Sequence, residues 1–207
     1  MPNVSSCVLD SDEDGCTMVW APVYSLQNEH LLKKSSLLTT LPILTKEWRL
    51  TFEINPKSYA SSYSQVVQIT KGGKSGQIGD RTPSLWFHKS RGVYLVSTLS
   101  GKANVGKFFR NSLPRVGEWT RLVISQAKVG SKYIFSLILA GKELWSAENL
   151  RPLEFSNVKV YASSPWYPAQ EASIRGLRVE NKLRGKCKVI VGQNIYESVC
   201  FSSTQME

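Results

Sequence analysis

The chain lacks the signatures of most enzymes, metalloproteins and membrane proteins. Its 207 residues include four cysteines without a C-x-x-C pair and only two histidines, which disfavours a zinc site. No apolar run approaches the ~18 residues of a transmembrane helix. There is no G-x-S-x-G, no H-E-x-x-H, no catalytic Cys–His set and no E-x-D-x-x-E carboxylate spacing of the kind glycosidases use. We therefore expect a protein that is not an enzyme.

Helical periodicity is also nearly absent, and short runs of β-branched and aromatic residues take its place. The clearest run is Glu47–Pro56, where Trp48, Leu50, Phe52 and Ile54 share one face and polar residues share the other. Roughly ten or more such runs follow one another between turn residues. This pattern predicts an all-β fold, a two-sheet antiparallel β-sandwich of the jelly-roll type, with a barrel as the alternative.

Two stretches predict hairpins. Gly117–Lys142 places a polar break between two strands, and its second strand, Tyr133–Leu139, is apolar on both faces, which predicts a central strand covered on both sides. Ser84–Lys89 and Val93–Leu99 flank a short turn and form the second hairpin. The residues after it, Ser100–Gly106, show no alternation and are expected to form a loop.

The order of these pieces resembles the concanavalin A-like lectin/glucanase superfamily, in the style of its laminin-G and pentraxin jelly rolls. Three segments carry the resemblance: Glu47–Ile54, Val116–Lys142, and the pair Asn157–Tyr161 with Ala172–Val179. The resemblance covers about residues 17–182 and rests on strand patterns. It implies extracellular recognition of glycan or protein, often with calcium. No pentraxin or legume-lectin metal loop and no galectin H-x-N-P-R pattern is present, so no ligand residues carry over.

The chain ends differ from the middle in composition. We expect an N-terminal arm over residues 1–16, the sandwich over residues 17–182, and a cysteine-bracketed hairpin or tail over residues 183–207. All cysteines lie at the ends and are candidates for disulfides in an oxidising compartment. Local pairing and end-to-end pairing both remain open. The four candidates are Cys7, Cys16, Cys187 and Cys200.

One acidic stretch has the spacing of a calcium loop. Asp10, Asp12 and Asp14 precede Gly15 and could surround Ca²⁺, but Ala21 occupies the twelfth position, where an EF-hand needs a glutamate. No helix pattern follows. An acidic surface turn is therefore the favoured interpretation, and Ca²⁺ is a weak candidate cofactor.

Five residues are candidate ligand contacts. Trp86 and His88 alternate on one strand face with Arg91 in the next turn, and Trp166 and Tyr167 lie in a loop stiffened by two prolines. Sugar sites combine a ring with polar groups that read hydroxyls. Packing in the core is the competing explanation for Trp86, and packing over the sandwich end is the one for Trp166.

The formal net charge of +10 bears on the partner. The basic residues are scattered, so solvated outer faces are favoured over an anion-binding patch. Nucleic acid is disfavoured because no concentrated basic and aromatic patch is visible. No signal peptide is visible, and a secreted protein would have lost it.

Together these features predict a secreted, lectin-like domain that binds a glycan, an acidic one given the charge, or a cell-surface glycoprotein. The alternative is a protein-interaction or adhesion module that uses the sandwich as a scaffold and self-associates.

Overall fold

The computed structural model describes residues 10–11, 17–184, 187–191 and 194–198. Pro22–Glu180 form one compact unit, and the described residues before and after it belong to a second unit. Within the described residues every regular element is a strand. None of them forms a helix that could cross a membrane.

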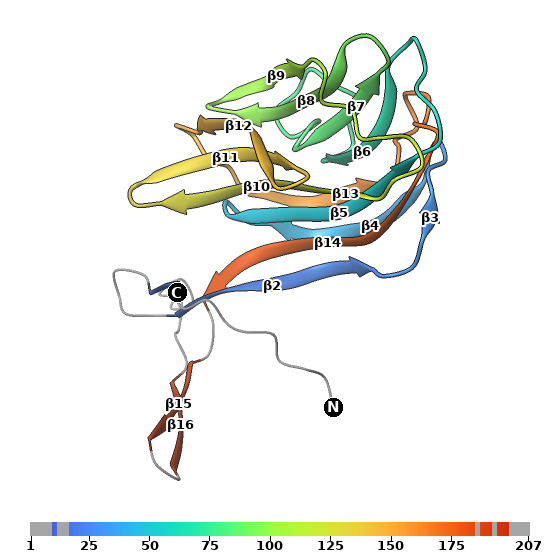
Figure 1. The fold of residues 1–207 in the computed structure, drawn as a ribbon. Coiled ribbons are helices and arrows are strands. Elements are labelled where there is room, and N and C mark those ends of the chain that lie inside the picture. Colours follow the sequence, from blue (N-terminus) through green and yellow to red (C-terminus); the bar gives the residue numbers. More distant parts are fainter. Residues whose placement is uncertain (1–9, 12–16, 185–186, 192–193, 199–207) are drawn as a thin grey trace. The chain divides into compact units, whose positions relative to one another are not determined.

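The compact unit is a sandwich of two antiparallel sheets (Figure 1). This confirms the fold class expected from the sequence. We name each sheet after one of its strands. The β5 sheet has the order β2 (Thr17–Leu26), β14 (Ala172–Arg184), β5 (Trp48–Pro56), β10 (Thr120–Val129), β11 (Lys132–Leu139) and β12 (Lys142–Glu148), with β3 (His30–Leu31) paired to β14. The β7 sheet has the order β4 (Leu37–Leu44), β13 (Phe155–Tyr161), β6 (Ser64–Thr70), β7 (Ser84–His88), β8 (Gly92–Leu99) and β9 (Lys102–Phe109).

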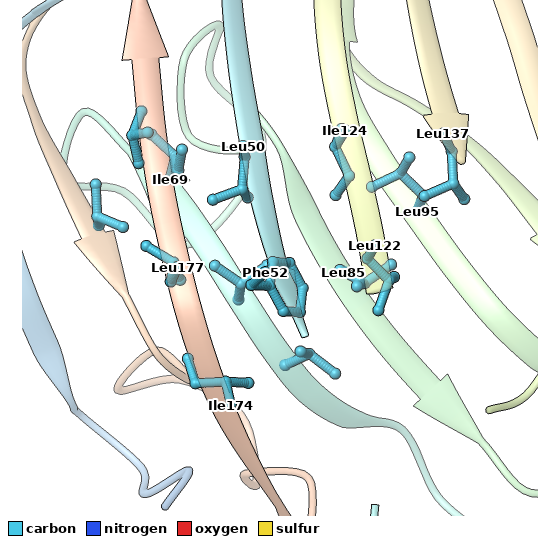
Figure 2. Packing of buried hydrophobic residues seen from close by; sticks show 14 of the residues in the cluster. Leu50, Phe52, Ile69, Leu85, Leu95, Leu122, Ile124, Leu137, Ile174 and Leu177 are labelled. Atoms are coloured by element: carbon cyan, nitrogen blue, oxygen red, sulfur yellow. The ribbon is translucent and has the colours of Figure 1, made fainter. Parts of the chain in front are cut away.

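The core lies between the two sheets, and the alternation of β5 shows how it forms. Trp48, Leu50, Phe52 and Ile54 are at most 2% exposed, while the residues between them are half-buried. Since neighbouring side chains of a strand point to opposite faces, one face of β5 is committed to the core. Figure 2 shows Leu and Ile side chains of both sheets meeting around Phe52.

The structure corrects the expected loop at Ser100–Gly106. Lys102–Phe109 form strand β9, which pairs with β8 along most of its length. Its sequence lacks clean alternation because β9 is the edge strand of its sheet and only a few of its side chains reach the core. The pairing with β8 therefore defines this strand, and local pattern does not.

The expectation of a strand covered on both faces is also wrong. In β11, Phe135, Leu137 and Leu139 enter the core, but Ile134 and Ile138 on the other face are only half-buried. β11 lies next to the edge strand β12, and its outward face is open to solvent. The apolar residues there are shielded by neighbours on the same face and not by another layer.

The second unit contains short strands. β1 (Asp10–Ser11) pairs with the start of β2, and β15 (Cys187–Val191) pairs with β16 (Asn194–Ser198) in a hairpin. Cys7, Cys16 and Cys200 lie outside the described residues, as do Asp12 and Asp14. The expected disulfides and the acidic calcium loop therefore stay predictions.

Candidate functional site

The outward face of β7, β8 and β9 carries a row of aromatic rings. Trp86 in β7 lies directly opposite Tyr94 in β8, and Tyr94 lies opposite Phe108 in β9. Cross-strand partners on one face are close enough for their side chains to touch. The ring centroids of Trp86 and Tyr94 are 5.5 Å apart, and Tyr94 and Phe108 are stacked at 4.0 Å with an angle of 10°. We call these three residues the aromatic row.

Exposure increases along the aromatic row toward the sheet edge. Trp86 is 3% exposed, Tyr94 is half-buried and Phe108 is 40% exposed. Gly106, beside Phe108 in β9, leaves the space that Tyr94 fills, because a Cβ there would lie 3.1 Å from the Tyr94 hydroxyl and 2.7 Å from Val96. Phe108 is thus the ring of the row most available to a ligand.

The loop between β13 and β14, which contains Pro168 and Gln170, lies against the neighbouring strand β6. Gln65 in β6 exchanges backbone hydrogen bonds with this loop: its N–H donates to the Pro168 carbonyl, and its own carbonyl accepts from the Gln170 N–H, both at 2.8 Å. The Gln65 side chain is fully buried and donates to Gln68 and Ser84. Among the strands on the far side of β6 from β13, exposure is greatest on β9, and the outward residues of β7 and β8 are mostly buried.

The same loop brings Tyr167 to one end of the aromatic row. The Tyr167 ring packs edge-on against Trp86 at 5.7 Å. The Arg81 guanidinium lies 4.9 Å from the centre of the Trp86 ring and donates hydrogen bonds to Tyr167 Oη at 2.7 Å and Asn104 Oδ1 at 3.2 Å. The Lys74 ammonium lies 5.3 Å from the Tyr167 ring. We call Lys74, Arg81 and Tyr167 the Arg81 subsite.

A second cationic cluster occupies the opposite end of β7. Arg91, in the β7–β8 turn, donates a 2.8 Å hydrogen bond to Tyr63 Oη, and its guanidinium lies 5.9 Å from the Phe108 ring. Tyr63 packs edge-on against His88 at 4.9 Å. We call Tyr63, His88 and Arg91 the Arg91 subsite.

The Tyr94 hydroxyl interacts electrostatically with residues of both subsites. Burial raises the pKa of the Tyr94 hydroxyl, the positive charge of Arg81 partly offsets this, and Tyr63 and Tyr167 raise the pKa further. The hydroxyl therefore stays protonated at neutral pH and can both donate and accept hydrogen bonds.

The strands of the β7 sheet carry no carboxylate, since none of the six contains Asp or Glu. Asp80, just before Arg81, is 6% exposed, and its carboxylate accepts a hydrogen bond from the Gln77 N–H. Within the described residues, neither Arg81 nor Arg91 forms an ion pair. Their guanidinium groups contact aromatic rings and donate hydrogen bonds to uncharged oxygen atoms.

The structure brings together four of the five candidate ligand residues. Trp86, His88, Arg91 and Tyr167 all adjoin the aromatic row, whereas Trp166 packs against Tyr161 in β13, two strands from β7. Asp10 and Cys187 lie in β1 and β15 of the second unit. Among the described residues, no group of acidic, histidine or cysteine side chains could hold a metal ion.

Five residues of this surface escaped sequence reasoning: Tyr63, Lys74, Arg81, Tyr94 and Phe108. Tyr94 lies in an apolar strand whose two faces look alike in sequence, and Phe108 follows the stretch expected to be a loop, Ser100–Gly106, so no strand was expected there. The usable signal was the Phe108–Phe109 pair, because adjacent strand residues face opposite ways and one ring had to point outward. Phe109 is buried, and Phe108 is the outward ring.

Two cavities lie away from this surface. The larger, of about 640 Å³, lies between the Arg110–Arg115 loop and the β11–β12 turn, and its only carboxylate is that of Glu118. The smaller, of about 360 Å³, is on the β5 sheet and contains one carboxylate, that of Glu53. Glycoside hydrolysis normally uses a pair of carboxyl groups across the bond that is cut. Neither cavity offers such a pair.

Comparison with known proteins establishes the fold alone. No family model and no curated protein matches the chain in sequence. Domain 4 of an extracellular arabinanase from Geobacillus stearothermophilus, solved with arabinotriose, is similar with a TM-score of 0.50 at 16% identity, covering 86% of this chain and 82% of that one. The botulinum neurotoxin type G receptor-binding domain has a TM-score of 0.47 at 13% identity. This chain covers 86% of itself but 49% of that domain. A human galectin-16 variant has a TM-score of 0.47 at 16% identity, covering 70% of this chain and 99% of that one. The likeness to the arabinanase domain concerns the fold alone, a two-sheet β-sandwich.

Proposed function

We propose that this chain is an extracellular, non-catalytic recognition domain that binds an acidic glycan on the outward face of β7, β8 and β9. The observation that carries the proposal is the aromatic row, flanked by arginines that have no carboxylate partner within the described residues. A face of this kind combines a ring for stacking with donors for hydroxyl and acidic groups. The arabinotriose bound to the similar arabinanase domain supports a saccharide as the ligand class.

The chemistry of the surface favours a sugar over a purely apolar ligand. Phe108 offers one ring face, because its other face is stacked on Tyr94. Polar groups lie beside that ring: the Arg91 guanidinium is 5.9 Å from its centre, and the Tyr94 ring stacked on it carries a hydroxyl. Sugar hydroxyls need such donors and acceptors, and a carboxylate or sulfate group pairs well with a guanidinium.

Binding to a glycan array, followed by calorimetry with the best ligand, tests this function. The array is run with Ca²⁺ and with a chelator, because Asp10, Asp12 and Asp14 have the spacing of a calcium loop. We expect acidic glycans to bind. Phe108→Ala should weaken binding about tenfold through loss of ring stacking. The matched control is Trp119→Ala, which removes a ring stacked 4.2 Å from the Arg175 guanidinium on the other sheet. An array without any acidic glycan bound, or equal loss in both variants, contradicts the proposal.

A second candidate function is self-association through the edge strand β4. This strand contains no charged residue, and Leu37 and Ile43 are 48% and 38% exposed. Edge strands without charge are prone to pair with another chain, although Pro42 removes one backbone donor from this edge. Light scattering should then detect dimers that Ile43→Lys dissociates without changing glycan affinity. A monomer at all accessible concentrations excludes this function.

A further inference from the structure

We infer, resting on the proposed function, that the ligand is a linear glycan with anionic groups at two separated positions, which contact the Arg81 subsite and the Arg91 subsite together. The chain of the glycan would run along β7, across the aromatic row. A single terminal acidic sugar would occupy only one subsite. The inference thus specifies the length and the charge spacing of the ligand.

The separation of the two subsites follows from the strand between them. Arg81 precedes β7 and Arg91 follows it, and β7 spans Ser84–His88. A strand advances about 3.4 Å per residue, so the ends of β7 are roughly 14 Å apart. This distance is several times the reach of one carboxylate or sulfate group. Two anionic groups of one ligand must therefore be separated by an uncharged stretch.

Arg81 is held in place for a ligand by its neighbours. Its two terminal nitrogens donate to Asn104 and Tyr167, and its guanidinium plane is flanked by the rings of Trp86 and Tyr167 at 4.9 Å and 5.8 Å. The buried Nε has no hydrogen-bond partner within the described residues. Each terminal nitrogen keeps a second hydrogen that these bonds do not use. A positioned guanidinium loses little side-chain freedom when it binds an anion.

Arg91 is fixed less firmly, because it is exposed and has one hydrogen bond, to Tyr63. Its exposure lets it adapt to anionic groups at slightly different distances. Between Arg81 and Arg91 the surface is uncharged, formed by the aromatic row. The order of the surface, cation then rings then cation, matches a ligand with the order anion, neutral sugar, anion.

A single-stranded nucleic acid is the other polyanion that combines charge with stacking. Its binding depends on free ring faces for successive bases. In the aromatic row, Trp86 is 3% exposed and Tyr94 is covered by Phe108, so only one ring face is open. One stacking face suits a single sugar ring between two anionic groups better than a run of bases.

The experiment measures affinity against ligand length. Sulfated heparin-derived and carboxylated galacturonate oligosaccharides of two, four and six sugars are titrated by calorimetry into the wild type, Arg81→Gln and Arg91→Gln. We expect the wild type to bind six sugars at least tenfold tighter than two, because the second contact becomes intramolecular. Either substitution should abolish this gain with length, while the affinity for two sugars changes about twofold.

The controls separate the possible failures. Arg175→Gln removes an arginine that also stacks on a ring, but on the β5 sheet, and should keep the full gain with length. A neutral maltohexaose should not bind measurably. Wild-type binding that is independent of length overturns the two-subsite inference and leaves glycan binding intact. Absence of binding at every length overturns the proposed function itself. An oligothymidylate that binds tighter than the acidic hexasaccharides overturns the inference in favour of nucleic acid.

Discussion

The two sheets share one core but differ in how they balance charge on their outward faces. On the β5 sheet, Arg49 pairs with Glu180 and Arg175 with Glu53, each with a nitrogen–oxygen distance of 2.7 Å. Lys132 adds a third pair, with Glu148 at 3.0 Å. On the β7 sheet no strand contains a carboxylate, and aromatic rings flank the arginines. Both sheets are antiparallel, and both contribute side chains to the core.

This difference indicates which face is prepared for a ligand. A salt bridge satisfies both of its charges and offers little to an incoming anion. A guanidinium next to a ring keeps its full charge and its unused donors, at a modest cation–π stabilisation. The β5 sheet thus neutralises Arg49, Lys132 and Arg175 with its own carboxylates, whereas Arg81 and Arg91 beside the β7 sheet keep their charge available.

The largest expected effect separates the shared core from the outward face. Phe135 in β11 is fully buried and packs against Trp48 and Trp145 at 6.1 Å and 5.2 Å. Phe135→Ala should lower the free energy of unfolding by about 3–5 kcal/mol through a cavity in the core. Phe108→Ala should lower it by about 1 kcal/mol, mostly through the lost stacking on Tyr94. Urea denaturation followed by circular dichroism measures both. Comparable losses would show that the aromatic row is part of the core.

The second prediction introduces an ion pair on the β7 sheet, like those between arginine and glutamate on the β5 sheet. Asn104→Asp puts a carboxylate of nearly the same shape at the position whose oxygen lies 3.2 Å from Arg81. It should change stability by less than about 1 kcal/mol, since exposed ion pairs contribute little. Affinity for an acidic hexasaccharide should fall about tenfold, because Arg81 is then neutralised. Unchanged affinity, measured by calorimetry, would show that Arg81 does not contact the ligand.

A third prediction distinguishes a structural tyrosine from a ligand-facing ring. Tyr59 donates a 2.5 Å hydrogen bond to the Pro114 carbonyl, and burial raises the pKa of its hydroxyl above the ordinary value of 10.0. Tyr59→Phe should cost about 1 kcal/mol of stability at pH 7 through the lost bond, with glycan affinity unchanged.

The raised pKa of Tyr59 also sets how this stability depends on pH. The folded state holds the Tyr59 proton more tightly than the unfolded state, so the contribution is complete below pH 10 and is lost as pH rises further. The stability difference between wild type and Tyr59→Phe should therefore shrink above pH 10. A difference that grows with pH in urea denaturation at pH 7–11 would contradict this assignment.

The smallest effect concerns the scaffold pairs. Arg175→Gln breaks the ion pair with Glu53, and both side chains are partly exposed, at 43% and 39%. We expect a loss of less than about 1 kcal/mol in unfolding free energy and no change in glycan affinity. A clear loss of affinity by calorimetry would mean that the β5 sheet also contacts the ligand and that the two faces are not functionally distinct.

The alternation of apolar and polar residues was sufficient to predict a strand where one face is buried and the other is exposed to solvent. The alternation in Glu47–Pro56 predicted strand β5 and its core residues, and the turn at Ser90-Arg91-Gly92 predicted the β7–β8 hairpin. The same reasoning failed for β9, whose pattern is weak because it lies at an edge. It also failed for the outward face of β11, because apolar composition does not distinguish cover by another layer from cover by neighbours on the same face.

The candidate site was predictable only in part. Trp86, His88 and Arg91 are close in sequence, so strand parity placed them on one face. Tyr63, Tyr94, Phe108 and Tyr167 join them through cross-strand register and loop packing, which no local pattern specifies. Trp166 and Tyr167 are adjacent in sequence, yet only Tyr167 reaches the aromatic row.

The sequence by itself determined an all-β sandwich, the main core faces and the basic character of the chain, because these depend on period-two hydrophobicity and on composition. The tertiary structure decided where the positive charge stays unpaired. Ion pairs such as Arg49–Glu180 join residues far apart in the chain, and only folding brings the glutamates to the β5 sheet and leaves Arg81 and Arg91 among aromatic rings.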